Sequence, residues 1–496
     1  MTEKKNSYRQ ILKATSVFGG VQVFQILISV VRSKFVAVLL GPNGMGIVGL
    51  LTATTGVVSG LTNFGLGTVA VKNISEAIST GDGRRISTVI TVLRRMVWIT
   101  GLLGALLTLI FSPWLSEFTF GNKKYTLAFV WISVTLLLNQ LTVGELVTMQ
   151  ALRQIQHLAK ANVYGSLVGL FITIPLYYLL GIEGIVPVII ITAFVTFFFS
   201  RYFSRKVTLE KVEVPQKTTI IVGKKMMETG FIISLSGLVG LVTAYLIRIF
   251  INHVGSVDDV GFYAAGFTLI NTYVGMIFTA MGTDYYPGLS RVAMDNAQCR
   301  ENINQQSKIA LLLLAPILII FLVFVNVAVI LLYSSEFLVI THMIYWAALG
   351  IFFKAASWAI AFVFLAKGEG KLYFWSEFGG SFYMLIFGIL GFSRGGLTGL
   401  GFAFLISFIV YLIQVFIIAK VKYNFSFHSS FKKIFAVQFL LALITFIIVN
   451  VVQQPYSYLP GLLLIAVSSW YSLRELEKRI GIKELIHNLM RKIKRK

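Results

Sequence analysis

The sequence predicts an all-α, polytopic membrane protein with about 14 transmembrane helices. The first observation is composition, because 56% of the 496 residues are hydrophobic and only 13% are charged. Soluble domains are about 45–50% apolar and about 25% charged. The second is the number of long apolar stretches, and the third is the distribution of basic residues between them. Together these exclude a soluble enzyme and a disordered chain.

Hydropathy predicts each span in turn, since a helix that crosses a bilayer needs about 20 apolar residues. The expected spans are about 15–38, 46–70, 92–112, 126–149, 163–181, 184–200, 228–252, 262–283, 308–333, 338–366, 372–391, 396–419, 434–452 and 456–473. An even number of spans places both termini on the same side of the membrane.

The charge of the chain tests this topology. There are 43 Lys and Arg residues against 20 Asp and Glu, a net charge of +23. With the N-terminus in the cytoplasm, 36 of the basic residues fall on cytoplasmic segments, and only Lys123, Lys124 and Arg394 fall on outer loops. This agrees with the positive-inside rule. The excess charge therefore indicates membrane orientation, with both termini cytoplasmic, and not a nucleic-acid partner.

An internal repeat is predicted from matched landmarks. Arg32 and Arg248 lie 216 positions apart, and Gly46 and Gly261 lie 215 apart. A repeat of six helices is parallel, with its pseudo-twofold axis along the membrane normal. We therefore expect two pseudo-symmetric six-helix lobes followed by two extra C-terminal helices. The predicted divisions are an N-lobe at 1–205, a cytoplasmic linker at 206–227, a C-lobe at 228–419, two helices at 420–473 and a basic amphipathic cytoplasmic tail at 474–496.

Charged residues inside the spans are the candidate functional groups. The four cations are Arg32, Lys34, Arg248 and Lys354. Each would cost about 2.5–3.5 kcal/mol in lipid, so we expect Arg32, Arg248 and Lys354 to line a wet cavity between the lobes. Lys34 lies about 200° around the helix from Arg32 and could instead snorkel to the interface. Since the cations outnumber the deep acids, the cavity should attract an anion, and Arg suits phosphate.

Glu145 and Glu377 are acids inside the spans, and Glu228 and Asp284 lie at cytoplasmic span ends. Each could form a salt bridge with a cation of the cavity or bind a coupling ion. No metal or cofactor is expected, because Cys299 is the only cysteine and the five histidines are scattered. No phosphate-binding loop, kinase or hydrolase motif occurs, so we do not expect an enzyme.

Several stretches resemble a known family over essentially the whole chain. They are RSKFVAVLLGPNGMGIVGLL at 32–51, AYLIRIFINHVGSVDDVGFYAAG at 244–266, YYPGLSR at 285–291 and LAKG at 365–368. These resemble the Wzx-type flippases of lipid-linked oligosaccharides, in the polysaccharide-transporter branch of the MOP superfamily, which also includes the MATE transporters. The O-antigen and lipid III flippases are the most similar members.

The resemblance implies a MATE/MOP-like transporter that works by alternating access. Its substrate would be an undecaprenyl-pyrophosphate-linked oligosaccharide, moved from the cytoplasmic to the periplasmic leaflet of the bacterial inner membrane. The substrate-binding residues that it implies are Arg32, Lys72, Arg248, Lys354 and Lys367, with Glu377 as a further charged residue. Lys72 and Lys367 lie at cytoplasmic helix ends, where positive-inside orientation explains them equally well.

Two other transporters stay open as alternatives: a flippase for lipid II, the peptidoglycan precursor, and a MATE-type multidrug exporter. Multidrug exporters of this superfamily usually place acids in the N-lobe, whereas the first span here carries only cations. A membrane polymerase or ligase would need large catalytic outer loops, which this chain lacks. The expected partners are the lipid-linked oligosaccharide, the bilayer, and polysaccharide polymerases and chain-length regulators.

Overall fold

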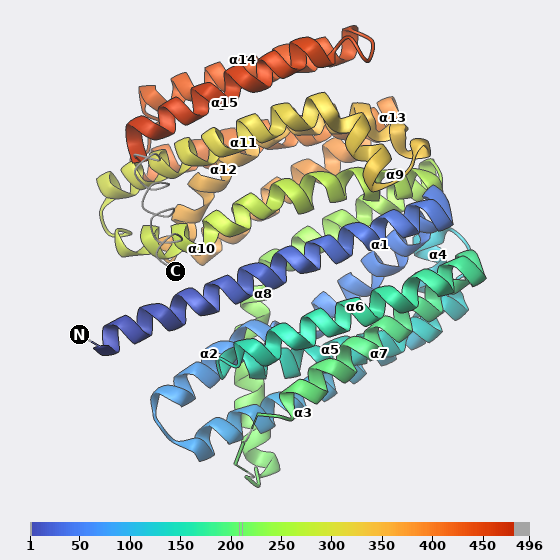
Figure 1. Ribbon diagram of the computed structural model, residues 1–496. Coiled ribbons are helices and arrows are strands. Elements are labelled where there is room, and N and C mark those ends of the chain that lie inside the picture. Colours follow the sequence, from blue (N-terminus) through green and yellow to red (C-terminus); the bar gives the residue numbers. More distant parts are fainter. Residues whose placement is uncertain (1, 208, 211, 481–496) are drawn as a thin grey trace. The chain divides into compact units, whose positions relative to one another are not determined.

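The computed structural model of the protein describes residues 2–207, 209–210 and 212–480, and in these ranges it contains helices and no strand (Figure 1). Contacts group the chain into two compact units. Met1–Gly261 with Leu332–Ser334 form unit 1, and Phe262–Leu331 with Ser335–Lys496 form unit 2. The lobes predicted from sequence are defined by an internal repeat, whereas these units are defined by contacts between residues. The boundaries of the predicted lobes therefore stay a prediction.

Unit 1 contains the helices up to α8. They are α1 (Thr2–Thr62), α2 (Leu66–Ser79), α3 (Gly83–Ile110), α4 (Ser112–Phe120), α5 (Thr126–Ala151), α6 (Ile155–Leu180), the 3-10 turn η1 (Gly181–Gly184), α7 (Ile185–Ser204) and α8 (Gln216–Val254). In Figure 1, α3, α5, α6 and α7 lie side by side, in agreement with their extensive mutual packing. Helix α9 (Val257–Thr268) begins in unit 1 and ends in unit 2.

Unit 2 contains the remaining elements. They are the π-helical turn η2 (Leu269–Val274), α10 (Gly275–Arg291), α11 (Asn296–Leu332), the 3-10 turn η3 (Ser335–Ile340), α12 (Thr341–Ala366), α13 (Gly370–Tyr423), α14 (Ser429–Val451) and α15 (Tyr458–Ile480). Helix α12 is the central helix: 72% of the apolar window in Ser335–Ala366 is buried, and α12 packs on α10, α13 and α14.

The predicted spans lie largely on helices, apart from a break after Thr62 in the span predicted at 46–70. Among the described residues, nine continuous segments are long and apolar enough to cross a membrane. Three of them hold two predicted spans each: Phe24–Thr62, Ile155–Ser204 and Gly370–Tyr423. The predicted spans at 262–283 and 456–473 lie on α9–α10 and on α15, outside the nine. The all-helical multi-pass fold predicted from sequence is therefore confirmed.

Glycines divide two of the long helices. Gly41 inside α1 has φ 65° and ψ −168°, and Gly396 inside α13 has φ 53° and ψ −139°. Positive φ is readily adopted by glycine and costs other residues energy, so each glycine lets the chain end one span and begin the next without a long loop. Gly41 lies between the predicted spans 15–38 and 46–70, and Gly396 lies at the start of the predicted span 396–419.

Local differences from the expected spans have simple backbone causes. The span predicted at 46–70 breaks after Thr62, where Phe64 and Gly65 both have positive φ, and α2 begins at Leu66. The outer loop expected near 113–125 contains helix α4, with a proline in its first turn. The predicted linker at 206–227 is helical from Gln216, and the predicted tail at 474–496 is a continuation of α15 up to Ile480, beyond which it lies outside the described residues.

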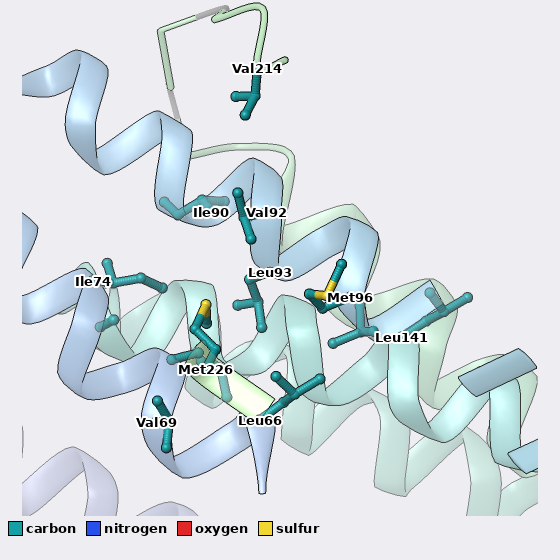
Figure 2. Packing of buried hydrophobic residues seen from close by; sticks show 14 residues of the cluster. Leu66, Val69, Ile74, Ile90, Val92, Leu93, Met96, Leu141, Val214 and Met226 are labelled. Atoms are coloured by element: carbon teal, nitrogen blue, oxygen red, sulfur yellow. The ribbon is translucent and has the colours of Figure 1, made fainter. Parts of the chain in front are cut away.

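A hydrophobic cluster holds the predicted cytoplasmic end of unit 1 together. Leu93 and Met96 of α3 and Met226 of α8 converge in it, as Figure 2 shows. Val214, from the segment before α8, covers the same cluster. All four are at least 94% buried. This apolar packing fixes α3 against α5 and α8, and so positions Arg94 and Arg95, which lie between Leu93 and Met96.

Helices α1 and α9 approach each other closely at two points that are related by the predicted repeat. A Cβ added at Gly46 would lie 2.9 Å from the carbonyl carbon of Val257. One added at Gly261 would lie 2.9 Å from the carbonyl carbon of Pro42. Gly261 lies 215 positions after Gly46, and Val257 lies 215 positions after Pro42. The two close approaches are therefore equivalent under the predicted repeat, and the contact is self-complementary.

A hydrogen bond joins the same two segments at that spacing. Asn43 donates to the carboxylate of Asp258, 215 positions further on, at 2.8 Å. The predicted pseudo-symmetry is therefore present in this contact.

Candidate functional site

Lys354 of α12 occupies a partly buried cluster in unit 2. Its ammonium donates to Asn271 Oδ1 at 3.3 Å, and in the described part of the chain this is its single hydrogen-bond acceptor. Three aromatic rings surround the charge, with centroids at 5.8 Å for Phe278, 5.9 Å for Phe404 and 5.3 Å for Phe408. Cation–π attraction to these rings offsets part of the cost of removing the ammonium from water.

The local backbone explains how Asn271 reaches Lys354. It lies in η2, where the chain forms a π-helical turn between α9 and α10. A π turn inside a helix rotates the side chains that follow it and frequently occurs at functional sites. An ammonium carries three donors, and among the described residues only one donor of Lys354 meets a protein acceptor. Lys354 can therefore also donate to an external anion.

Glu377 of α13 supplies the negative charge near Lys354. Its carboxylate accepts a hydrogen bond from the buried Tyr411 hydroxyl at 2.5 Å, and it lies close enough to Lys354 for their charges to attract. These two described residues form no ion pair within 4.0 Å. Glu377 therefore moderates the positive charge of Lys354 without occupying its donors.

A row of aromatic rings continues along α12 from Lys354. The ring of Trp358 lies 5.4 Å from that of Phe278 and 5.1 Å from that of Phe362. Phe362 in turn lies 6.1 Å from the exposed Tyr286 of α10. Aromatic faces carry partial negative charge and pack well against the C–H faces of sugar rings. The row thus joins a cationic site to a surface suited to carbohydrate.

Arg32 lies in the interior of unit 1. Its Nη2 is 3.3 Å from where a Cβ of Gly169 in α6 would be, so the glycine leaves room for the guanidinium. The Arg32 Nε is buried without a hydrogen-bond partner among the described residues. Lys34 points elsewhere and donates to the main-chain carbonyl of Tyr333. Arg32 and Lys34 thus have different contacts, and which of them faces the expected cavity stays a prediction.

Arg248 of α8 folds back along its own helix, where Nη1 donates to the carbonyl of Ala244 at 3.2 Å. Although Arg32 and Arg248 are matched in the predicted repeat, their surroundings differ. Arg32 packs against Gly169 of α6, whereas the half-buried Arg248 contacts the main chain of its own helix.

Glu145 has partners that the sequence reasoning did not identify. Its carboxylate is 95% buried in α5, pairs with Arg94 of α3 at 3.3 Å, and accepts a hydrogen bond from Arg201 of α7. Both arginines were counted from sequence only as orienting cytoplasmic charges. Spacing along the chain could not have revealed the triad, because three separate helices bring it together.

Replacing Glu145 by glutamine should destabilise unit 1. Glu145→Gln leaves two arginines facing a neutral amide, and breaking a buried pair costs about 3–5 kcal/mol, reduced here to about 2 kcal/mol because the arginine side chains are each 34% exposed. Thermal unfolding of the purified protein in detergent measures the loss.

The matched control is Glu76→Gln. Glu76 pairs with Lys72 at 3.8 Å, and both side chains are largely exposed, so its loss should cost less than about 0.5 kcal/mol. Equal unfolding midpoints for the two variants would show that the Glu145 triad contributes no stability.

The other predicted residues lie apart from these clusters. Lys72 is exposed on α2 and pairs with Glu76. Lys367, at the end of α12, donates to Asn296 Oδ1 at 2.8 Å and to the carbonyl of Ala293, which ties α12 to the α10–α11 connection. The side chain of Asp284 lies outside the described part of the structure. Thus Lys354 and Glu377 are brought together in unit 2, and Arg32 and Arg248 lie in unit 1.

This arrangement of apolar helices around partly buried cations is that of a multi-pass membrane protein. The fold is shared with solved transporters of the MOP superfamily. An inward-facing multidrug resistance MATE transporter has a TM-score of 0.66 at 15% identity, with 82% of this chain and 96% of that chain covered. The lipid II flippase MurJ, in an inward closed conformation, has a TM-score of 0.62 at 15% identity over 94% and 99% of the two chains.

The sequence places the chain within a family. Residues 35–342 match the family described as polysaccharide biosynthesis protein, which is more than half of the chain. The chain belongs to this family. A relative from Shigella flexneri, named "Putative O-antigen transporter", is 23% identical over 357 residues, or 70% of this chain and 82% of that protein. The resemblance found from sequence is confirmed.

Proposed function

We propose that the protein moves an undecaprenyl-pyrophosphate-linked oligosaccharide, an O-antigen or related repeat unit, from the cytoplasmic to the periplasmic leaflet. Family membership and the name of the Shigella flexneri relative support this substrate class. The observation in the structure that carries the proposal is Lys354, a cation in a predicted span that donates to a single acceptor, Asn271, among the described residues.

Lys354 binds the pyrophosphate in this proposal. Phosphate oxygens are the natural acceptors for ammonium donors that the protein leaves unpaired. Glu377, held by Tyr411, lowers the net charge of the cluster, so that the pyrophosphate is bound and also released. Sugars adjoining the pyrophosphate stack on the aromatic row from Trp358 to Tyr286.

Arg32 and Arg248 act as further cations for the head group, with weaker support than Lys354. Arg32 has a buried Nε without a hydrogen-bond partner, which an anion could satisfy. We assign Lys72 to membrane orientation and Lys367 to loop packing, because Lys72 pairs with Glu76 and Lys367 donates to Ala293 and Asn296. Differential contacts of the head group with inward and outward states drive alternating access.

The setting that follows is the bacterial inner membrane, with both termini in the cytoplasm. Support comes from the distribution of basic residues, which favours the cytoplasmic segments by 36 to 3. Polymerases and chain-length regulators of polysaccharide assembly would then act on the product at the periplasmic face.

Reconstitution into liposomes tests the substrate. The full chain is compared with protein-free vesicles for movement of undecaprenyl-pyrophosphate-linked oligosaccharide, purified from cells that lack the protein and identified by mass spectrometry. Lipid II and a cationic drug are offered to the same vesicles. We expect rapid movement of the oligosaccharide lipid alone.

Two outcomes would contradict the proposal. Movement of lipid II at an equal or greater rate would assign the protein to peptidoglycan precursor transport. Movement of the drug without movement of either lipid would assign it to multidrug export.

A further inference from the structure

A second cationic site lies in unit 1, at the predicted cytoplasmic ends of α3, α5 and α7. It is a cavity of about 330 Å³ lined by Arg94, Glu145, Arg201 and Arg205, together with the aromatic side chains of Trp98 and Phe197. Three arginines face one carboxylate, so the cavity has an excess of positive charge. An adjoining cavity of about 370 Å³ shares Phe197, Arg201 and Arg205 with it and adds Lys206.

The cationic groups of this site are only partly used by the protein. Glu145 binds Arg94 and Arg201, yet the Arg94 Nε is buried without a hydrogen-bond partner. Within the described residues, the exposed Arg205 side chain forms no hydrogen bond or ion pair. A group with several negatively charged oxygens would satisfy these donors, and arginine forks match phosphate oxygens in geometry.

The surroundings of the two cavities favour an amphiphile over a soluble ion. The aromatic side chains beside the arginines are exposed on the outer faces of α3 and α7: Trp98 by 49%, Phe194 by 56%, Phe198 by 54% and Tyr202 by 48%. In a membrane such aromatic side chains lie against acyl chains and at the level of the headgroups. The site thus places cations directly beside a surface for hydrocarbon.

We propose that this cluster, the α3–α5–α7 arginine site, binds the phosphate headgroup of an anionic phospholipid from the inner leaflet. The phosphodiester lies among Arg94, Arg201 and Arg205, and the acyl chains run along Phe194 and Phe198. Basic pockets between transmembrane helices on the cytoplasmic side are suited to such headgroups. The residues of this site all belong to unit 1, and none of them contacts Lys354 among the described residues.

Native mass spectrometry of the full chain in detergent tests the site, with phosphatidylglycerol, cardiolipin or the zwitterionic phosphatidylethanolamine added at equal concentrations. We expect one tightly bound anionic lipid per chain and weak binding of phosphatidylethanolamine. Arg205→Gln should weaken binding of the anionic lipid about tenfold, because it removes a charge-assisted contact. The Glu145 triad is left intact in this variant, so folding should be preserved.

Arg84→Gln is the matched control, since Arg84 is an exposed arginine of α3 that does not line either cavity. It should bind the anionic lipids as the unaltered chain does. Equal binding by Arg205→Gln and the unaltered chain would overturn the proposal, as would equal binding of phosphatidylethanolamine. Displacement of the phospholipid by an equal concentration of inorganic phosphate would overturn the lipid assignment and leave a site for a soluble anion.

Discussion

Replacing Lys354 by glutamine is expected to reduce transport of the lipid-linked oligosaccharide about tenfold or more, with the fold retained. A hydrogen bond to a charged group contributes about 1.5–3 kcal/mol, and the neutral amide of Lys354→Gln loses both the charge and its attraction to the surrounding rings. Initial rates of head-group movement in reconstituted vesicles measure the effect.

Two companion variants separate charge from general disturbance. Lys354→Arg keeps the positive charge and should retain more transport than Lys354→Gln. Lys371→Gln removes an equal charge from an exposed position of the same unit and should transport normally. Transport by Lys354→Gln at the rate of Lys371→Gln would refute the assignment of Lys354 to the pyrophosphate.

The Gly46→Ala variant is expected to be less stable than the unaltered protein by about 2 kcal/mol or more. The added methyl group would meet the main-chain carbonyl of Val257, which cannot rotate away as a side chain can. The backbones of α1 and α9 would therefore have to separate, and the hydrogen bond from Asn43 to Asp258 would lengthen. Unfolding in detergent, followed by helix content, measures the change.

Gly56→Ala in the same helix is the matched control. A Cβ at Gly56 would meet nothing within 4 Å. Alanine is the better helix former, so this variant should be unchanged or stabilised by up to about 1 kcal/mol. Equal stability of Gly46→Ala and Gly56→Ala would contradict this prediction. It would mean that the main chains at Gly46 and Val257 lie further apart than the structure shows.

The fold was largely predictable, because a lipid environment leaves few options for the backbone. Apolar runs of spanning length must be helical in order to satisfy their own hydrogen bonds. The helix breaks at Gly41 and Gly396 lie close to predicted span ends, because glycine is a strong sequence signal for a break in a helix. The break after Thr62 was not predicted, because Phe64 has positive φ although nothing in its residue type favours that conformation.

The candidate site was only partly predictable. Lys354 and Glu377 were recognised because a charge in an apolar run is costly and conspicuous. Asn271 gave no such signal, since a lone amide in a span is unremarkable and its position depends on the π turn η2. Arg94 and Arg201 were assigned to orientation, and their attachment to Glu145 depends on helix packing that charge counting cannot reveal.

The self-complementary contact of Gly46 with Val257 and of Gly261 with Pro42 affects how the protein can evolve. In a homodimer one mutation alters both sides of such an interface at once. Here each side is encoded separately, so one half can change while the other keeps the original geometry. Arg32 and Arg248 illustrate the result, because the first now lies against Gly169 and the second against its own helix. Joining two halves in one gene thus allows a symmetric scaffold to acquire an asymmetric binding surface one substitution at a time.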